Sequence, residues 1–160
     1  MTIETAIEAA LFGRVLTLDL LGGPQLAWPN KYFKPNGPYV RIDHLPNSTT
    51  RLFIGSVAPQ LWQGILQLTV VTPLNGGATT ATDLAGSIAE HFDADLALYG
   101  DGVKVRIQRA PDIMAPVKTD ATWGVRVDVY YDCIASMVDL STFAQLDFSL
   151  SKNSQYLPLI

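Results

Sequence analysis

The two-residue alternation in WGVRVDVYYDC, residues 123–133, constrains the fold of this chain more than any other feature. Val, Val, Val, Tyr and Cys occupy every second position from 125, and Arg, Asp, Tyr and Asp lie between them. Because successive side chains of a strand point to opposite faces of a sheet, this run predicts a long strand with one buried face. Cys133, the single cysteine, lies on the apolar face, so we interpret it as a small buried hydrophobe rather than a nucleophile.

Four further segments read as strands. YVRIDHL at residues 39–45 and RLFIGSV from residue 51 flank an Asn-Ser-Thr turn and predict a hairpin. LWQGILQLTVV, residues 61–71, has one packed face and one half-exposed face, and VKVRIQ from residue 103 alternates apolar with polar side chains. The sequence therefore predicts about five strands.

Apolar residues spaced three or four positions apart predict two helices. The first spans residues 2–20, and the second runs from residue 79 or 80 to about 98. Thr2 supplies capping chemistry for the first helix, and Thr80 with Asp83 resembles a capping box for the second. Strands placed between two helices predict an α+β domain, with a mostly antiparallel sheet of about five strands and two main helices packed on it.

The charge pattern argues against tight binding of nucleic acid. The formal net charge is -4 and the sequence has no run of lysine or arginine, whereas a protein that grips phosphates carries a basic stripe. Charged residues make up only 16% of the chain, which is explained equally well by a large core or by partners that cover apolar surface. The first residues are acidic rather than basic, and no apolar run has the length of a membrane helix. We expect a soluble protein of cytoplasmic origin without a membrane partner.

No catalytic, cofactor-binding or metal-binding residues are predicted. The glycine pair in LNGGATTATD lies between a predicted strand and a helix, but the lysine of a phosphate-binding loop is missing, so we interpret it as a turn. His44 and His91 have no second metal ligand at a recognisable spacing. No pair of acids has the pattern of a glycosidase or nuclease site. The sequence predicts a protein that is not an enzyme and needs no cofactor.

Three segments do not fit a regular element. Residues 21–37, rich in Gly, Pro and aromatics, are predicted to be irregular. Residues 109–121 are either a hairpin folded on their own sheet or an arm that protrudes toward another subunit, and we favour the arm. The segment from 138 carries few charges and many apolar residues, which is typical of a docked segment. We therefore divide the chain into a domain at 1–137 and a C-terminal arm at 138–160, docked on its own or a neighbouring subunit.

The order and the residue patterns of several segments resemble those of a known family. FKPNGPYVRIDHLP, LWQGILQLTVVTPLNGG, ATDLAGSIAEHF and TWGVRVDVYYDC are similar to segments of the tail terminator proteins of long-tailed, siphovirus-like bacteriophages and prophages. The resemblance covers roughly residues 2–135, and the segment after 138 is not part of it. It implies a sheet with helices packed on it, in agreement with the elements read from periodicity.

The resemblance also implies a function based on geometry rather than chemistry. Tail terminators form a six-fold ring on the last ring of the tail tube, stop its polymerisation and present a surface to the head connector. Implied partners are further copies of the chain, the tail tube protein and the connector or neck protein, while DNA passes through the lumen without specific binding. The implied location is the head-proximal end of the virion tail, after assembly in the host cytoplasm.

We predict that aromatic, arginine and apolar side chains in the irregular segments contact other subunits or partners, because such residues are favoured at interfaces. The candidates are Trp28, Tyr32, Phe33, Arg109, Ile113, Met114, Phe143, Leu146 and Phe148. Two alternatives remain open at this stage. One is a head-completion or neck protein, or a tail-tube subunit, and the less favoured one is a small-molecule-binding domain or an enzyme.

Overall fold

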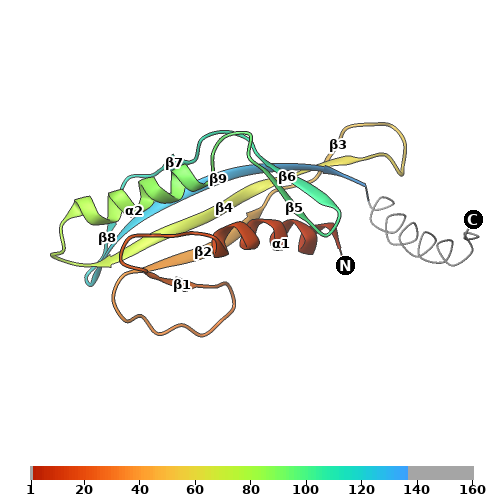
Figure 1. The fold of residues 1–160 in the computed structure, drawn as a ribbon. Coiled ribbons are helices and arrows are strands. Elements are labelled where there is room, and N and C mark those ends of the chain that lie inside the picture. Colours follow the sequence, from red (N-terminus) through yellow and green to blue (C-terminus); the bar gives the residue numbers. More distant parts are fainter. Residues whose placement is uncertain (1, 137–160) are drawn as a thin grey trace, which may run out of the picture.

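The computed structural model describes residues 2–136, which form a curved sheet with helices on one face (Figure 1). Within these residues there are two helices and nine strands. The helices are α1 (Ile3–Leu16) and α2 (Ala78–His91). The strands are β1 (Gln25–Ala27), β2 (Tyr39–Pro46), β3 (Thr50–Arg51), β4 (Gln60–Pro73), β5 (Ala97–Gly100), β6 (Val103–Ile107), β7 (Asp112–Ile113), β8 (Val117–Lys118) and β9 (Thr122–Ala135).

Two long strands, β4 and β9, form the centre of the sheet. They pair antiparallel over their whole length, from Gln60 opposite Ala135 to Pro73 opposite Thr122. The main strand order is β1-β2-β4-β9-β6-β5, with β3 added to β4 and with β7 and β8 added to β9. The pair β1–β2 is parallel, and the other pairs are antiparallel. All nine strands thus belong to one sheet.

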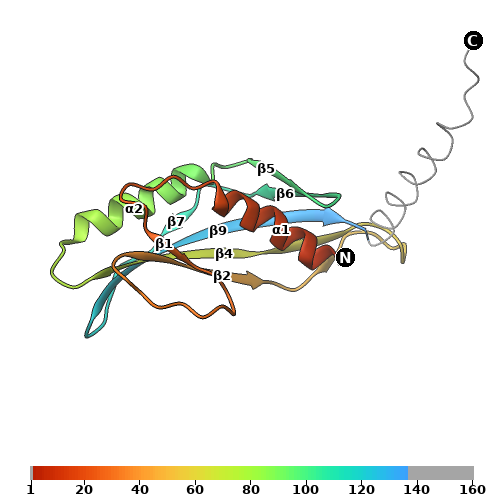
Figure 2. The same ribbon diagram turned by 60° about the horizontal axis from the view of Figure 1, so that its bottom comes forward.

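The core lies between the helices and one face of this sheet. On β9 the predicted apolar positions, from Val125 to Cys133, are all buried, and Leu66 and Leu68 of β4 are fully buried beside them. Helix α2 packs on β9 and β4, whereas α1 packs on β5 and β6. Figure 2 shows both helices against the same side of the sheet. The alternation read in residues 123–133 is therefore confirmed, as is the α+β class.

The predicted description of the sheet needs correction. A mostly antiparallel sheet of about five strands is replaced by a larger, mixed sheet of nine strands within the described residues. Four of the nine strands are only two or three residues long, which is too short for a periodic pattern to be recognised. One of these, β1, lies within the segment 21–37 that was predicted to be irregular.

The predicted hairpin of residues 39–45 with a strand from 51 is wrong. Only Thr50–Arg51 is extended, and it pairs with β4 rather than with β2. The partner of β2 is β4, with Val40 opposite Val70 and Ile42 opposite Leu68. The apolar residues that follow Arg51 belong to a connection at the end of the sheet, so their hydrophobicity does not reflect a buried strand face.

Both helices are shorter than predicted. Helix α1 ends at Leu16, and its N-cap Thr2 forms the expected capping box with Thr5.

Helix α2 ends at His91, and the segment predicted as its last turns contains strand β5. The predicted cap at Thr80 and Asp83 is wrong, because Gly77 is the N-cap and no side chain caps the helix. With φ of 82°, Gly77 confirms that the glycine pair forms a turn requiring positive φ.

The segment 109–121 lies along its own sheet. Asp112–Ile113 pairs with Asp128 and Val127, and Val117–Lys118 pairs with Gly124 and Trp123. The protruding arm favoured from the sequence is therefore corrected to the alternative, a segment folded onto its own sheet. Strands β7 and β8 follow one another antiparallel to β9 and form a hairpin with it, and we call this segment the hairpin 109–121. Two prolines interrupt the segment, and they restrict β7 and β8 to two residues each.

A chain of hydrogen bonds crosses the sheet at Gly64. The hydroxyl of Tyr131 lies 2.6 Å from Nε2 of His44, and Nδ1 of His44 lies 3.0 Å from Oε1 of Glu8 on α1. Tyr131 is paired directly with Gly64, and a Cβ added to Gly64 would lie 2.6 Å from the Tyr131 hydroxyl and 2.7 Å from the carbonyl oxygen of Leu45. The missing side chain of Gly64 therefore makes room for the contact that joins β9, β2 and α1.

We expect Gly64→Ala to lower the free energy of unfolding by about 1–3 kcal/mol, because the added methyl overlaps a backbone oxygen and a bonded hydroxyl. Chemical denaturation measures this change. Gly13→Ala is the matched control: an added Cβ meets nothing within 4 Å there, and alanine favours a helix by roughly 0.5–1 kcal/mol. A Gly64→Ala variant as stable as the wild type would show that the Tyr131–His44 contact moves aside at no cost.

Candidate functional site: the helix-free face of the sheet

The sheet face opposite the helices carries polar side chains in cross-strand rows. In the first row Arg41 of β2 lies opposite Thr69 of β4, which lies opposite Arg126 of β9. The neighbouring row contains Asp43, Gln67 and Asp128 in the same order, and β7 extends it with Asp112. A row of cations thus runs beside a row of anions. We refer to this surface, formed by these two rows and their neighbours on the same side, as the helix-free face.

Each arginine of the first row is paired along its own strand. Nε of Arg41 lies 2.9 Å from Oδ2 of Asp43, and Nε of Arg126 lies 3.1 Å from Oδ1 of Asp128. Gln67 donates a further hydrogen bond of 3.1 Å from Nε2 to the same oxygen of Asp128. Asp128 is only 4% exposed, so its charge is shielded by its partners. These opposite charges balance within the face.

Two more arginine–aspartate pairs extend the pattern toward the outer strands. Arg106 of β6 donates to both oxygens of Asp132 at 3.2 and 2.6 Å, and this hydrogen bonding raises the pKa of Arg106. Arg109 donates to both oxygens of Asp112 at 3.0 and 2.8 Å, which likewise raises the pKa of Arg109. The guanidinium of Arg109 also lies 4.1 Å from the centre of the Tyr130 ring. The contact with Tyr130 joins the hairpin 109–121 to β9, whereas the pair of Arg106 and Asp132 joins β6 to β9.

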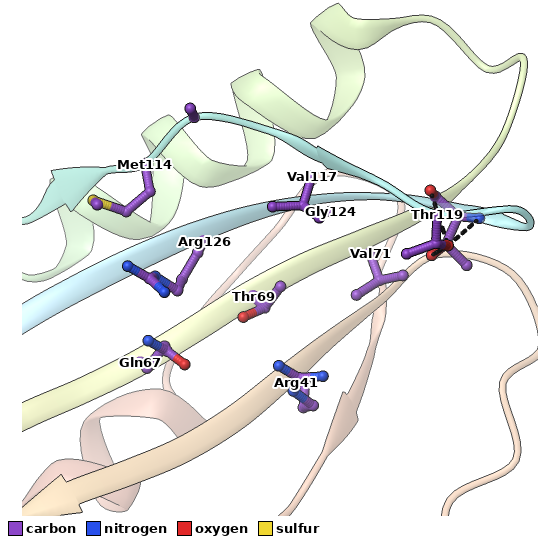
Figure 3. A pocket seen from close by; sticks show the side chains of 11 residues that line it. Arg41, Gln67, Thr69, Val71, Met114, Val117, Thr119, Gly124 and Arg126 are labelled. Atoms are coloured by element: carbon purple, nitrogen blue, oxygen red, sulfur yellow. Dashed lines mark hydrogen bonds between the residues drawn. The ribbon is translucent and has the colours of Figure 1, made fainter.

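The helix-free face is hollowed between β2 and the hairpin 109–121 (Figure 3). The cavity has a volume of about 420 Å³. Its lining combines two guanidinium groups, hydroxyl and amide groups, a methionine and two valines. The lining residues are Arg41, Gln67, Thr69, Val71, Met114, Ala115, Val117, Thr119, Thr122, Gly124 and Arg126. The Thr69 hydroxyl oxygen is shielded from water and has no hydrogen-bond partner among the described residues. A surface of mixed polar and apolar groups of this kind is typical of protein interfaces.

The reactive side chains considered in the sequence lie on the other face, in the core. Cys133 is 1% exposed, and burial raises the pKa of its thiol to about 11, so the thiol is protonated at neutral pH. Burial also raises the pKa of Tyr131. The interpretation of Cys133 as a small hydrophobe is therefore confirmed.

The two histidines connect elements of the fold. His44 bridges Tyr131 and Glu8, while Nε2 of His91 lies 3.0 Å from the backbone oxygen of Arg14 at the end of α1. In turn, Arg14 donates a hydrogen bond of 2.8 Å from Nη2 to the backbone oxygen of His91. Residues 2–136 contain no group of three His, Cys, Asp or Glu side chains arranged to hold a metal ion. Neither helix of this part of the chain is long and apolar enough to cross a membrane.

The contact candidates between β1 and β2 are partly packed. Trp28 stacks edge-on against Phe12 of α1 with 5.4 Å between ring centroids, and Phe33 lies 5.0 Å from the ring of Tyr39. Of these three aromatic candidates, only Tyr32 is almost fully exposed, with 94% of its surface accessible to solvent. Packing on the domain thus accounts for part of the aromatic content of this segment.

The candidates in the hairpin 109–121 lie together beside β9. Ile113 and Met114 are 44% and 37% exposed, and the amide of Met114 donates to the backbone oxygen of Arg126 at 2.8 Å. Arg109 belongs to the same group through Asp112. Three strands, β2, β4 and β9, separate this group from β1. The candidates Phe143, Leu146 and Phe148 lie outside the described residues.

Sequence reasoning did not identify the row of Arg41, Thr69 and Arg126. The alternation assigned Arg41 and Arg126 to the polar faces of their strands, but it contained no information about which residues are opposite each other. A signal was present in the repeated Arg-x-Asp spacing of RID at 41–43 and RVD at 126–128, which places both charges on the same side of a strand.

Comparisons with known proteins agree with the family suggested by the sequence. A family model described as phage tail terminator protein matches residues 6–131, so the chain belongs to the phage tail terminator family. One solved structure is similar with a TM-score of 0.69 and 25% sequence identity, over 83% of this chain and 96% of that one. No curated protein matches the chain. Family membership indicates a component of the phage tail.

The shielded carboxylate of Asp128 leads to a prediction about stability. We expect Asp128→Ala to lower the free energy of unfolding by about 1–3 kcal/mol, because Arg126 and Gln67 lose their common acceptor in a shielded place. Asp43→Ala removes the same type of pair from an exposed site, so we expect a change of about 0–1 kcal/mol. Urea denaturation of both variants measures the difference. Equal losses would mean that shielding does not distinguish the two pairs.

Proposed function

We propose that this protein forms a ring at the head-proximal end of the phage tail tube, where it stops tube polymerisation and provides the surface that joins the tail to the head connector. The match of the tail terminator family to residues 6–131 carries this proposal. That range includes α1 from Ala6 onward, the whole of α2 and β9 up to Tyr131, and therefore nearly all of the described fold. The remaining support comes from the arrangement of side chains on the helix-free face and from the edges of the sheet.

The helix-free face is suited to docking against another protein. Its opposite face is covered by α1 and α2, so this side of the sheet is the one left open. Its arginine and aspartate side chains are held in fixed positions by their mutual hydrogen bonds, which lowers the entropy lost on binding. Balanced charges in defined rows favour a partner of matching pattern over a merely charged one. We assign this face to contact with the tube or the connector.

A closed ring requires two different surfaces on each subunit, because head-to-tail contacts join unlike patches. The described sheet has two such surfaces at its edges. On the main path β1 pairs only with β2, and β5 pairs only with β6, so each presents an unpaired side. Tyr32 and Phe33 lie in the connection that follows β1, and Tyr99 of β5 is 73% exposed. We assign these two edges to contacts between neighbouring copies in a six-fold ring.

The charge of the chain fits a ring through which DNA moves. With a formal net charge of -4 and paired arginines on the helix-free face, the protein offers little attraction to phosphate groups. A neutral or acidic lumen would let DNA pass without being held. DNA is therefore proposed to pass through the ring without specific binding.

Measurement of the solution mass, followed by incubation with polymerised tail tubes, tests the proposed function. We expect either six times the 17.4 kDa subunit mass by light scattering, or a monomer that binds tube ends and halts their growth. Electron microscopy of tube lengths with and without the protein provides the second readout.

Two results would contradict this proposal. Purified protein that polymerises into long tubes would identify a tube subunit instead. Protein that leaves tube ends growing would point to neck assembly.

We expect the double variant Ile113→Asp with Met114→Asp to bind tube ends at least about tenfold more weakly, because two charges would enter an apolar part of the interface. Circular dichroism should show an unchanged fold, since both side chains are partly exposed. Leu21→Asp, at a residue 92% exposed and remote from β9, is the control for a charge added elsewhere. Unfolding of the double variant would show instead that these side chains stabilise the subunit.

A further inference from the structure

The connection between β3 and β4 exposes an unusual amount of apolar surface. Leu52, Phe53 and Ile54 are 42%, 55% and 95% exposed, and Val57 is 68% exposed. Figure 1 shows this connection at the end of the sheet where β9 also ends. Four large apolar side chains within six consecutive residues form a patch of the kind that usually contacts another segment. We call residues 52–57 the apolar loop.

A groove runs beside the apolar loop on the helix side of the sheet. It has a volume of about 270 Å³ and is lined mainly by Val57, Ala58, Trp62 and Ala135. The indole N–H of Trp62 is shielded from water, yet it has no hydrogen-bond acceptor among the described residues. An acceptor such as a backbone carbonyl would fit there, because a buried donor without a partner is costly. The groove therefore has the properties of a site for a further stretch of chain.

The polypeptide itself leads into this groove. Ser136, the last described residue, lines it, and its hydroxyl donates a hydrogen bond of 3.1 Å to the backbone oxygen of Val57. The 24 residues that follow contain only Asp139, Asp147 and Lys152 as charged residues, whereas half of them are hydrophobic. An apolar segment thus begins in direct contact with an apolar surface.

We propose that residues 137–160 dock on the groove and the apolar loop of their own chain. A segment tethered at Ser136 has a local concentration in the millimolar range or above, so binding within one chain is favoured over binding to a second copy. Docking would cover Phe53 and Ile54 and bring carbonyl groups to the indole of Trp62. This inference goes beyond the proposed function, because it concerns a single subunit and requires neither a ring nor a tail tube.

Hydrogen exchange of the full-length protein, read by mass spectrometry, tests the docking. In the wild type we expect amides of residues 137–160 to exchange at least about tenfold more slowly than in a synthetic peptide of the same sequence. The double variant Phe53→Asp with Ile54→Asp should lose this protection, by a factor of roughly ten to a hundred, because two charges would face the docked segment. The matched control is Leu21→Asp with Tyr32→Asp, two exposed apolar residues of a different connection, and it should retain the protection.

Exchange is measured at two protein concentrations a hundredfold apart, both prepared from a monomeric fraction. Protection that is independent of concentration supports docking within one chain, whereas protection seen only at the higher concentration would assign the groove to a second copy and overturn the proposal. Wild-type exchange as fast as in the peptide, or protection that survives Phe53→Asp with Ile54→Asp, would also overturn it. Unchanged exchange in β4 and β9 of every variant shows that the domain remains folded, and no tail tube takes part in the measurement.

Discussion

The antiparallel pairing of β4 with β9 is the interaction on which the rest of the structure depends. The two strands are paired along all of their 14 residues. Five further strands pair directly with one or the other, and β1 and β5 are added to β2 and β6. Because side chains alternate with a period of two, a slip of one residue would turn Val127 and Val129 toward the open face and Asp128 toward the helices. The register of this pair therefore decides at once which residues form the core and which form the helix-free face.

The helix-free face follows from that register. Arg41, Thr69 and Arg126 come from three strands, and they form a row only because β2 and β9 are both aligned with β4. Their charges are balanced by Asp43 and Asp128 on the same strands, so the face can stay exposed to water or meet a partner without an uncompensated charge. Such a surface is suited to assembly by shape and pattern, in agreement with the role indicated by the family.

Particular elements show how far prediction from the sequence reaches. The faces of β9, the α+β class and the cap at Thr2 were predicted correctly, because periodicity and capping depend on neighbouring residues. Residues 51–57 were taken for a strand because apolar residues favour strands wherever they occur, whether buried or at an exposed end. The last predicted turns of the second helix became β5, since pairing with β6 outweighs local helix preference. Contact residues were sought in loops, whereas the ordered polar face is built on strands.

The sequence by itself determined the two faces of the long strands, the place where each helix begins and the family of the protein, because these depend on the order and spacing of residues along the chain. The tertiary structure decided which strands are neighbours, that β1 runs parallel to β2, and that Arg41, Thr69 and Arg126 meet. It also decided that residues 109–121 lie on β9. The physical reason is that hydrogen bonds between strands join residues far apart in the chain, and a pattern along one strand contains no information about its partner.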